Sequence, residues 1–149
     1  MKKYVLILVI IGTFFIYPKQ TNAVSIPCSM ILHTMDNSYP NAKGAALIYK
    51  VKLTPSFPRT SISIHALHLP EPSSLGNYDS YEGFAYIPEV ISWRFSLYPT
   101  PEEFAPTWAG RFDLITAEME NVEVQVRLTN LKTKKLGPSI LTNNIKYCD

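Results

Sequence analysis

Two cysteines constrain the fold of this chain more than any other feature, because they lie near the two ends of the sequence that follows the N-terminal apolar run. Cys28 and Cys148 are the only cysteines among the 149 residues. In the loop-entropy model, a disulfide that closes so long a ring contributes on the order of 5 kcal/mol to stability. We therefore predict an intramolecular Cys28–Cys148 disulfide, rather than a cross-linked oligomer or free thiols, which brings the two ends of the domain together in an oxidising compartment.

The first 23 residues have the pattern of a secretory signal peptide. Lys2 and Lys3 precede an apolar run from Val5 to Ile16, and a polar stretch then ends in Thr21-Asn22-Ala23. The apolar run is shorter than the roughly 18 residues that a membrane-spanning helix needs. We predict a signal peptide over residues 1–23, a single β-sandwich domain over 24–149, and a secreted protein that does not stay in the membrane.

The charge of the predicted mature chain excludes a nucleic-acid partner. The precursor has 14 basic and 12 acidic residues, but Lys2, Lys3 and Lys19 leave with the signal peptide, so 11 basic residues face 12 acidic ones. The cluster of Lys132, Lys134 and Lys135 is too short to follow a phosphate backbone. The sequence does not indicate an oligomeric state.

Alternation of apolar and polar residues is the dominant pattern of the predicted domain. It is clearest from Ile91 to Tyr98 and from Val122 to Thr129, and it recurs with Leu47, Tyr49, Val51 and Leu53 on one face. A two-residue period is typical of half-buried β-strands. Shorter candidate strands are Ser29–Met35, Thr60–Leu69, Phe84–Ile87, Arg111–Ile115 and Ile140–Cys148.

Groups of proline and glycine separate these eight candidate strands and mark the turns. The pattern predicts an all-β fold, an antiparallel β-sandwich or a small β-barrel. In architecture alone, it resembles the immunoglobulin-like class of sandwiches. Only two short stretches are candidates for helix: Thr100–Phe104, where Thr100 and Glu103 resemble a capping box, and Thr116–Glu120.

No catalytic, metal or cofactor motif is present. His65 and His68 are three residues apart in a predicted strand, so their side chains would point to opposite faces and could not chelate one ion. We predict no metal, no cofactor and no enzymatic activity. A small hydrolase stays open as an alternative, and it requires at least two of Asp113, Glu118, Glu120 and Glu123 to share a cleft.

A tyrosine-rich segment is the best candidate for recognition. Tyrosine mixed with Asn, Asp, Ser and Gly supplies large contact areas at low entropic cost, as in recognition loops. The hypothesised binding residues are Tyr78, Asp79, Tyr81, Glu82, Tyr86 and, in a separate linker, Trp108. The alternative is that these rings cover the core. The sequence thus favours a secreted, non-enzymatic module that recognises an extracellular protein or glycan or decorates a cell surface; a structural subunit of a matrix or coat stays open.

Overall fold

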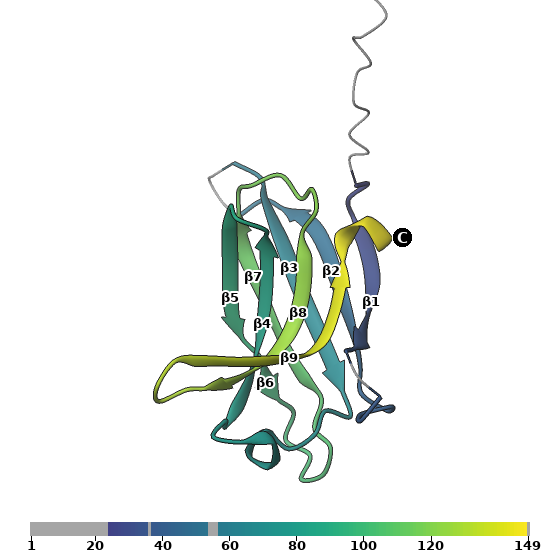
Figure 1. Cartoon of the computed structure of the whole chain (residues 1–149). Helices are drawn as coiled ribbons and strands as arrows, with labels where there is room; N and C mark the ends of the chain where they lie inside the picture. The colour runs from purple at the N-terminus through teal and green to yellow at the C-terminus, as the bar shows by residue number, and fades with distance from the viewer. Residues whose placement is uncertain (1–23, 36, 54–56, 149) are drawn as a thin grey trace, which may run out of the picture.

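The computed structural model describes residues 24–35, 37–53 and 57–148. The predicted signal peptide, residues 1–23, lies outside the described residues. Figure 1 shows the strands and the short 3-10 helices of the described part: β1 (Cys28–Thr34), β2 (Lys43–Val51), β3 (Arg59–Leu67), η1 (Pro72–Leu75), β4 (Ser80–Ile87), β5 (Ile91–Ser96), β6 (Tyr98–Pro99), β7 (Trp108–Ile115), β8 (Glu123–Asn130), β9 (Lys135–Asn144) and η2 (Ile145–Tyr147). None of the helices in these ranges is long and apolar enough to cross a membrane.

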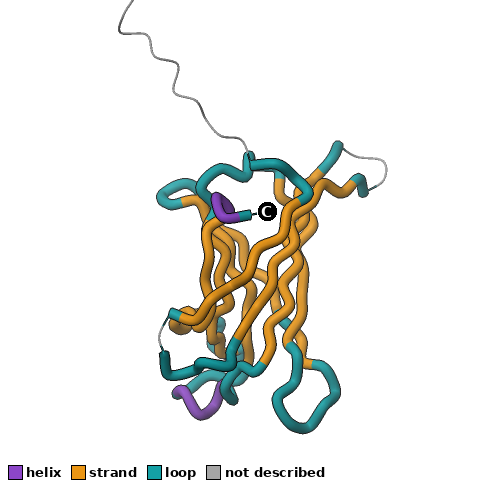
Figure 2. The backbone as a smooth tube through the Cα atoms, turned by 90° about the vertical axis from the view of Figure 1, so that its right-hand side faces the viewer, coloured by secondary structure: helices purple, strands orange, loops and turns teal. Residues whose placement is uncertain are grey.

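The strands form one antiparallel sheet in the order β5-β4-β8-β9-β1-β2-β3-β7-β6. It folds into two layers that face each other (Figure 2), which we call the β2 layer (β1, β2, β3, β7 and β6) and the β8 layer (β5, β4, β8 and β9). Two places join the layers. β1 pairs with β2 through Cys28–Leu32 and then with β9 through His33–Thr34, while β5 pairs with β4 and its continuation β6 pairs with β7. The result is a nearly closed, barrel-like sheet, so the predicted all-β antiparallel class is confirmed.

The core lies between the layers and follows the predicted alternation on most strands. Val124, Val126 and Leu128 of β8 are fully buried, and Trp93 and Phe95 of β5 face the same interior. Burial of large apolar side chains of this kind is worth about 1.5–3 kcal/mol each, which makes this interior the main source of stability.

On β2 the residues that face the core differ from those that the pattern indicated. Ala46 and Ile48 are buried, whereas Leu47 lies on the outer face and is 46% exposed. The strand begins at Lys43, and its inner face includes two small residues, Gly44 and Ala46, of which Gly44 lies against Leu32 and Leu141. Hydrophobicity counting overlooks such residues, although close packing of the layers requires them.

The predicted disulfide is present. Cys28 at the start of β1 and Cys148 just after η2 are bonded, with their Cα atoms 5.5 Å apart. The first described residues and the C-terminal end therefore lie at the same end of the molecule (Figure 1).

Neither of the two candidate stretches is a helix. Residues 100–107 form a loop in which the Thr100 backbone N–H donates to the Thr107 carbonyl oxygen, and the Thr107 N–H donates back to the Thr100 hydroxyl oxygen. Thr100 thus closes a loop across seven residues instead of capping a helix. Residues 116–120 are irregular as well, because the chain there crosses from β7 in one layer to β8 in the other.

Candidate functional site

The tyrosine-rich segment is mostly strand, and the two-residue period divides its side chains between the core and the surface. Tyr81 of β4 points inward and is fully buried. Its ring meets the ring of Trp108 edge to face at 5.1 Å, and its hydroxyl donates to the carbonyl oxygen of Pro70 at 2.7 Å. Burial raises the pKa of Tyr81 far above its ordinary value, so the hydroxyl stays a donor. Tyr81 and Trp108 are therefore parts of the core.

The outward side chains of β4 are engaged with neighbouring strands. Glu82 pairs with Arg94 at 2.8 Å and accepts from the Thr129 hydroxyl at 3.1 Å. Burial and a hydrogen bond with Glu123 raise the pKa of Tyr86. These groups bind each other across the outer face of the β8 layer, which leaves them little free hydrogen-bonding capacity for a ligand.

The beginning of the segment supports the β8–β9 hairpin. The ring of Tyr78 lies so close over Gly137 that a side chain at that glycine would collide with it. Asp79 is exposed, and its carboxylate accepts from the Leu131 backbone N–H at 2.8 Å. The structure thus places the six proposed recognition residues in three separate environments and does not gather them into one rim.

Two of the four carboxylates considered for a hydrolase share a hollow, as that alternative requires, and the other two lie elsewhere. Glu118 and Glu120 line one small hollow of about 180 Å³. The Asp113 carboxylate on β7 accepts a hydrogen bond from the Ser61 hydroxyl at 2.7 Å and forms an ion pair with Arg111 at 3.0 Å. The Glu123 carboxylate on β8 accepts hydrogen bonds from the side chains of Gln125 and Thr142. Among the described residues, no group of three or more His, Cys, Asp or Glu side chains is placed to hold a metal ion.

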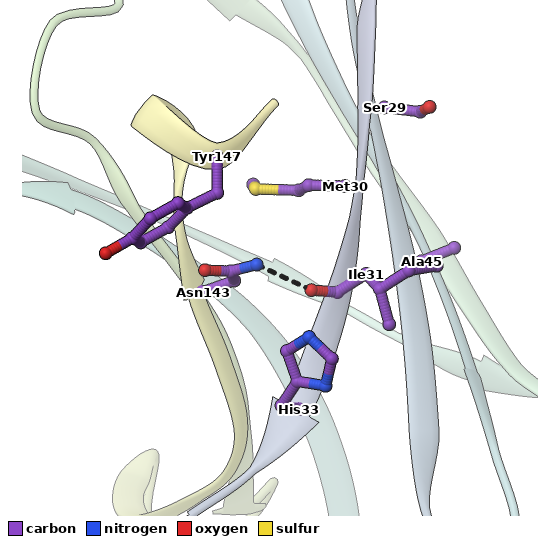
Figure 3. Close-up of a pocket in the computed structure, with 7 residues that line it drawn as sticks. All are labelled: Ser29, Met30, Ile31, His33, Ala45, Asn143 and Tyr147. Atoms are coloured by element: carbon purple, nitrogen blue, oxygen red, sulfur yellow. Dashed lines mark hydrogen bonds between the residues drawn. The ribbon is translucent and has the colours of Figure 1, made fainter. Parts of the chain in front are cut away.

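A different hollow lies where β1 changes partner, and we call it the seam pocket. It has a volume of about 580 Å³ and is shown in Figure 3, lined by Ser29, Met30, Ile31, His33, Ala45, Asn143 and Tyr147. β1 and β9 form ladder pairs only at His33–Thr142 and Thr34–Leu141 within the described chain. Beyond these pairs the two strands separate, and the pocket lies at this opening.

The opening is framed at both ends. The Cys28–Cys148 disulfide ties β1 to the end of the chain on one side, and the His33–Thr142 pair closes the other. Between them the Asn143 side-chain amide donates to the carbonyl oxygen of Ile31 at 2.7 Å, as the dashed line in Figure 3 shows. Because alternate residues of a strand direct their backbone groups to the same side, those of Ser29 face the opening too.

The lining offers an aromatic ring beside several hydrogen-bonding groups. Tyr147 on η2 is 61% exposed, with the Lys146 ammonium 4.8 Å from its ring centre. Ile31 is 53% exposed and supplies an apolar surface, while His33, Ser29 and Asn143 supply an imidazole, a hydroxyl and an amide. Among the described residues that line this pocket, none has a carboxylate. The arrangement suits an uncharged, hydroxyl-rich ligand with one apolar face.

Sequence reasoning missed this pocket, although one clue was available. A disulfide brings the residues beside its two cysteines together, so a Cys28–Cys148 bond implies that Ser29 and Tyr147 are near each other. Tyr147 lies apart from the tyrosine-rich segment, whose composition is the stronger signal of a recognition loop. The change of partner along β1 leaves no recognisable sequence pattern.

Fold and site together define a small all-β protein whose ends are joined by a disulfide beside a surface pocket. The chain belongs to the YoqH family: the family model described as "SPbeta prophage-derived uncharacterized protein YoqH" matches residues 24–149. The protein of that name from Bacillus subtilis (strain 168) is 63% identical over 149 residues, which cover 99% of each chain. No solved structure matches this chain.

Proposed function

We propose that this protein is exported and binds a glycan through the seam pocket, as a recognition module and not as an enzyme. The single observation that carries the proposal is the exposed ring of Tyr147 beside the Asn143 amide and the His33 imidazole, in a hollow of about 580 Å³. Ligand pockets commonly enclose about 300–1,000 Å³. A sugar ring presents one apolar face for stacking and hydroxyls for hydrogen bonds, which is what this lining complements.

The frame of the pocket favours a glycan over an extended peptide. A peptide that adds to a sheet needs a free strand edge along which to form main-chain hydrogen bonds. Here the disulfide holds the two edges together at one end, with 5.5 Å between the Cα atoms, and ladder pairs hold them at the other. A compact sugar ring can enter an opening that is closed at both ends, whereas an extended peptide strand cannot pair along it.

Export is supported by the N-terminal pattern and by the disulfide, since disulfides persist in oxidising compartments. The relative from Bacillus subtilis is named as prophage-derived. An exported product of such a genome would meet extracellular glycans on leaving its host, which agrees with a glycan-binding role.

Replacing Tyr147 tests the pocket directly. Tyr147→Ala is expected to weaken glycan binding about tenfold, because the stacking ring is lost. The midpoint of thermal unfolding should change little, since the side chain is 61% exposed. The measurement is isothermal titration of a panel of glucose, N-acetylglucosamine, mannose and galactose oligosaccharides.

A matched control is available in the loop of residues 100–107. Phe104 is 83% exposed and comes from the irregular segment after β6, so Phe104→Ala removes an exposed aromatic ring that does not line the pocket. This variant should bind like the unchanged protein. Binding by Tyr147→Ala at full strength, or no binding of any oligosaccharide in the panel, would contradict the proposal.

A further inference from the structure

A second hollow lies on the same face of the molecule as the seam pocket. It has a volume of about 260 Å³ and is lined by Ser63, Ile64, His65, Ala109, Gly110 and Arg111. These residues belong to β3 and β7, whereas the seam pocket lies at β1 and β2. All four strands are neighbours in the β2 layer, and Figure 1 shows them side by side.

The strand register connects the two hollows. Ile31 pairs with Ala45, Ala45 with His65, His65 with Ala109, and Ala109 with Tyr98. Paired residues of antiparallel strands direct their side chains to the same face, so these five form one row across the outer face of the β2 layer. The row begins in the seam pocket and continues through the second hollow to β6.

The row has small side chains on both sides of its central residue, His65. Alanines stand on either side of His65, and each of them lines one of the hollows. Larger exposed side chains flank the row: Leu47 on β2 is 46% exposed, and the side chain of Arg111 on β7 is 68% exposed. The exposed ring of Tyr147 lies at one end and that of Tyr98, 70% exposed, at the other. From β1 to β7 the row crosses three strand spacings, about 14 Å.

We propose that the two hollows form one groove that binds a linear, uncharged oligosaccharide of roughly four sugars, laid across the strands. This inference rests on the proposed function and specifies its ligand. The first sugar stacks on Tyr147, the chain passes over Ala45, and the His65 imidazole hydrogen-bonds hydroxyls of the sugars on both sides. The last sugar lies over Ala109 and reaches Tyr98.

The direction of the row and the charge of its lining residues support a saccharide as the ligand. A peptide that adds to a sheet runs parallel to the strands at an edge, whereas this row runs across all five strands of the β2 layer. Among the described residues that line the two hollows, Arg111 is the one Lys, Arg, Asp or Glu, and its guanidinium is paired with Asp113 at 3.0 Å. Hydroxyls of Ser29 and Ser63 and the two imidazoles suit a neutral polyol chain.

The test is a series of chain lengths. The probes are β-1,4-linked oligomers of N-acetylglucosamine and of glucose, from one to six units, titrated into the exported protein. Affinity for one of the two series is expected to rise at least about tenfold from the monosaccharide to the tetrasaccharide and then to level off. Raising the salt concentration should change it little, because no ion pair is formed.

Two variants locate the extended part of the groove. His65→Ala and Tyr98→Ala should weaken tetrasaccharide binding about fivefold to tenfold while leaving monosaccharide binding unchanged. His68→Ala is the matched control, since His68 is exposed but lies beyond the end of β3 and lines neither hollow. It should bind every length like the unchanged protein.

The outcomes separate this inference from the proposal on which it rests. If Tyr147→Ala weakens binding but affinity does not depend on chain length and is unchanged in His65→Ala and Tyr98→Ala, the extended groove is wrong and the seam pocket stands. If neither series binds, the groove is wrong, and the pocket is overturned with it if no oligosaccharide of the wider panel binds or if Tyr147→Ala binds like the unchanged protein.

Discussion

Reducing the Cys28–Cys148 disulfide is expected to lower the free energy of unfolding by about 3–5 kcal/mol. The bond joins residues 120 positions apart, so it closes nearly the whole domain into one loop. Its loss increases the conformational entropy of the unfolded chain, which favours unfolding. The loss also releases η2 and with it Tyr147, so glycan binding should fall together with stability. The measurement is a urea titration of protein recovered from the medium, with and without reductant.

The double variant Cys28→Ser, Cys148→Ser is the control for this experiment. It should match the reduced protein in stability, and reductant should not change it further. The intact mass of the unreduced protein should be lower than that of the reduced protein by the two thiol hydrogens, and the chain should begin at Val24. Folded protein in which both thiols react with an alkylating reagent would contradict the prediction.

Truncating Tyr81 is expected to cost about 3–5 kcal/mol of stability. The ring is fully buried against Trp108, and its removal leaves a cavity in a core that two rigid layers surround. Tyr81→Phe keeps the ring and removes only the hydrogen bond to the Pro70 carbonyl, so it should cost about 1 kcal/mol. The measurement is chemical denaturation of each variant.

Tyr98→Ala serves as the comparison for stability, because this tyrosine is 70% exposed. It should change the free energy of unfolding by less than about 0.5 kcal/mol. If Tyr81→Ala were as stable as Tyr98→Ala, the placement of Tyr81 in the core would be wrong, and its part in recognition would need to be considered again.

Alternation predicted β5 and β8 well, because large apolar residues mark their inner faces, whereas β4 begins at Ser80 and not at Phe84, and β9 spans Lys135–Asn144 and not Ile140–Cys148. Val124, Val126 and Leu128 were expected to share a face, and all three are fully buried. The method failed on β2, where Gly44 and Ala46 face the core and Leu47 faces outward. The exposed Leu47 borders the proposed groove, so the position where hydrophobic counting misled is part of the surface that we propose to be functional.

The candidate site could be predicted only in part, for a related reason. Pairing of the two cysteines follows from their number and positions, and it brings Ser29 and Tyr147 together. The opening itself depends on β1 leaving β2 for β9 at His33, and the groove depends on a register that joins residues from five strands. Such features arise from the pairing of distant strands, which the local pattern of one strand does not specify.

The most direct test of the proposed site is an amide NMR titration of isotope-labelled protein with the tetrasaccharide of N-acetylglucosamine or of glucose that binds more tightly. The proposed site predicts the largest shifts at Ile31, Tyr147 and the Asn143 side-chain amide, which donates to Ile31 across the opening. Smaller shifts should follow at His65 and Ala109. Shifts confined to Phe84 and Tyr86 on the outer face of the β8 layer, with Ile31 and Asn143 unchanged, would contradict it.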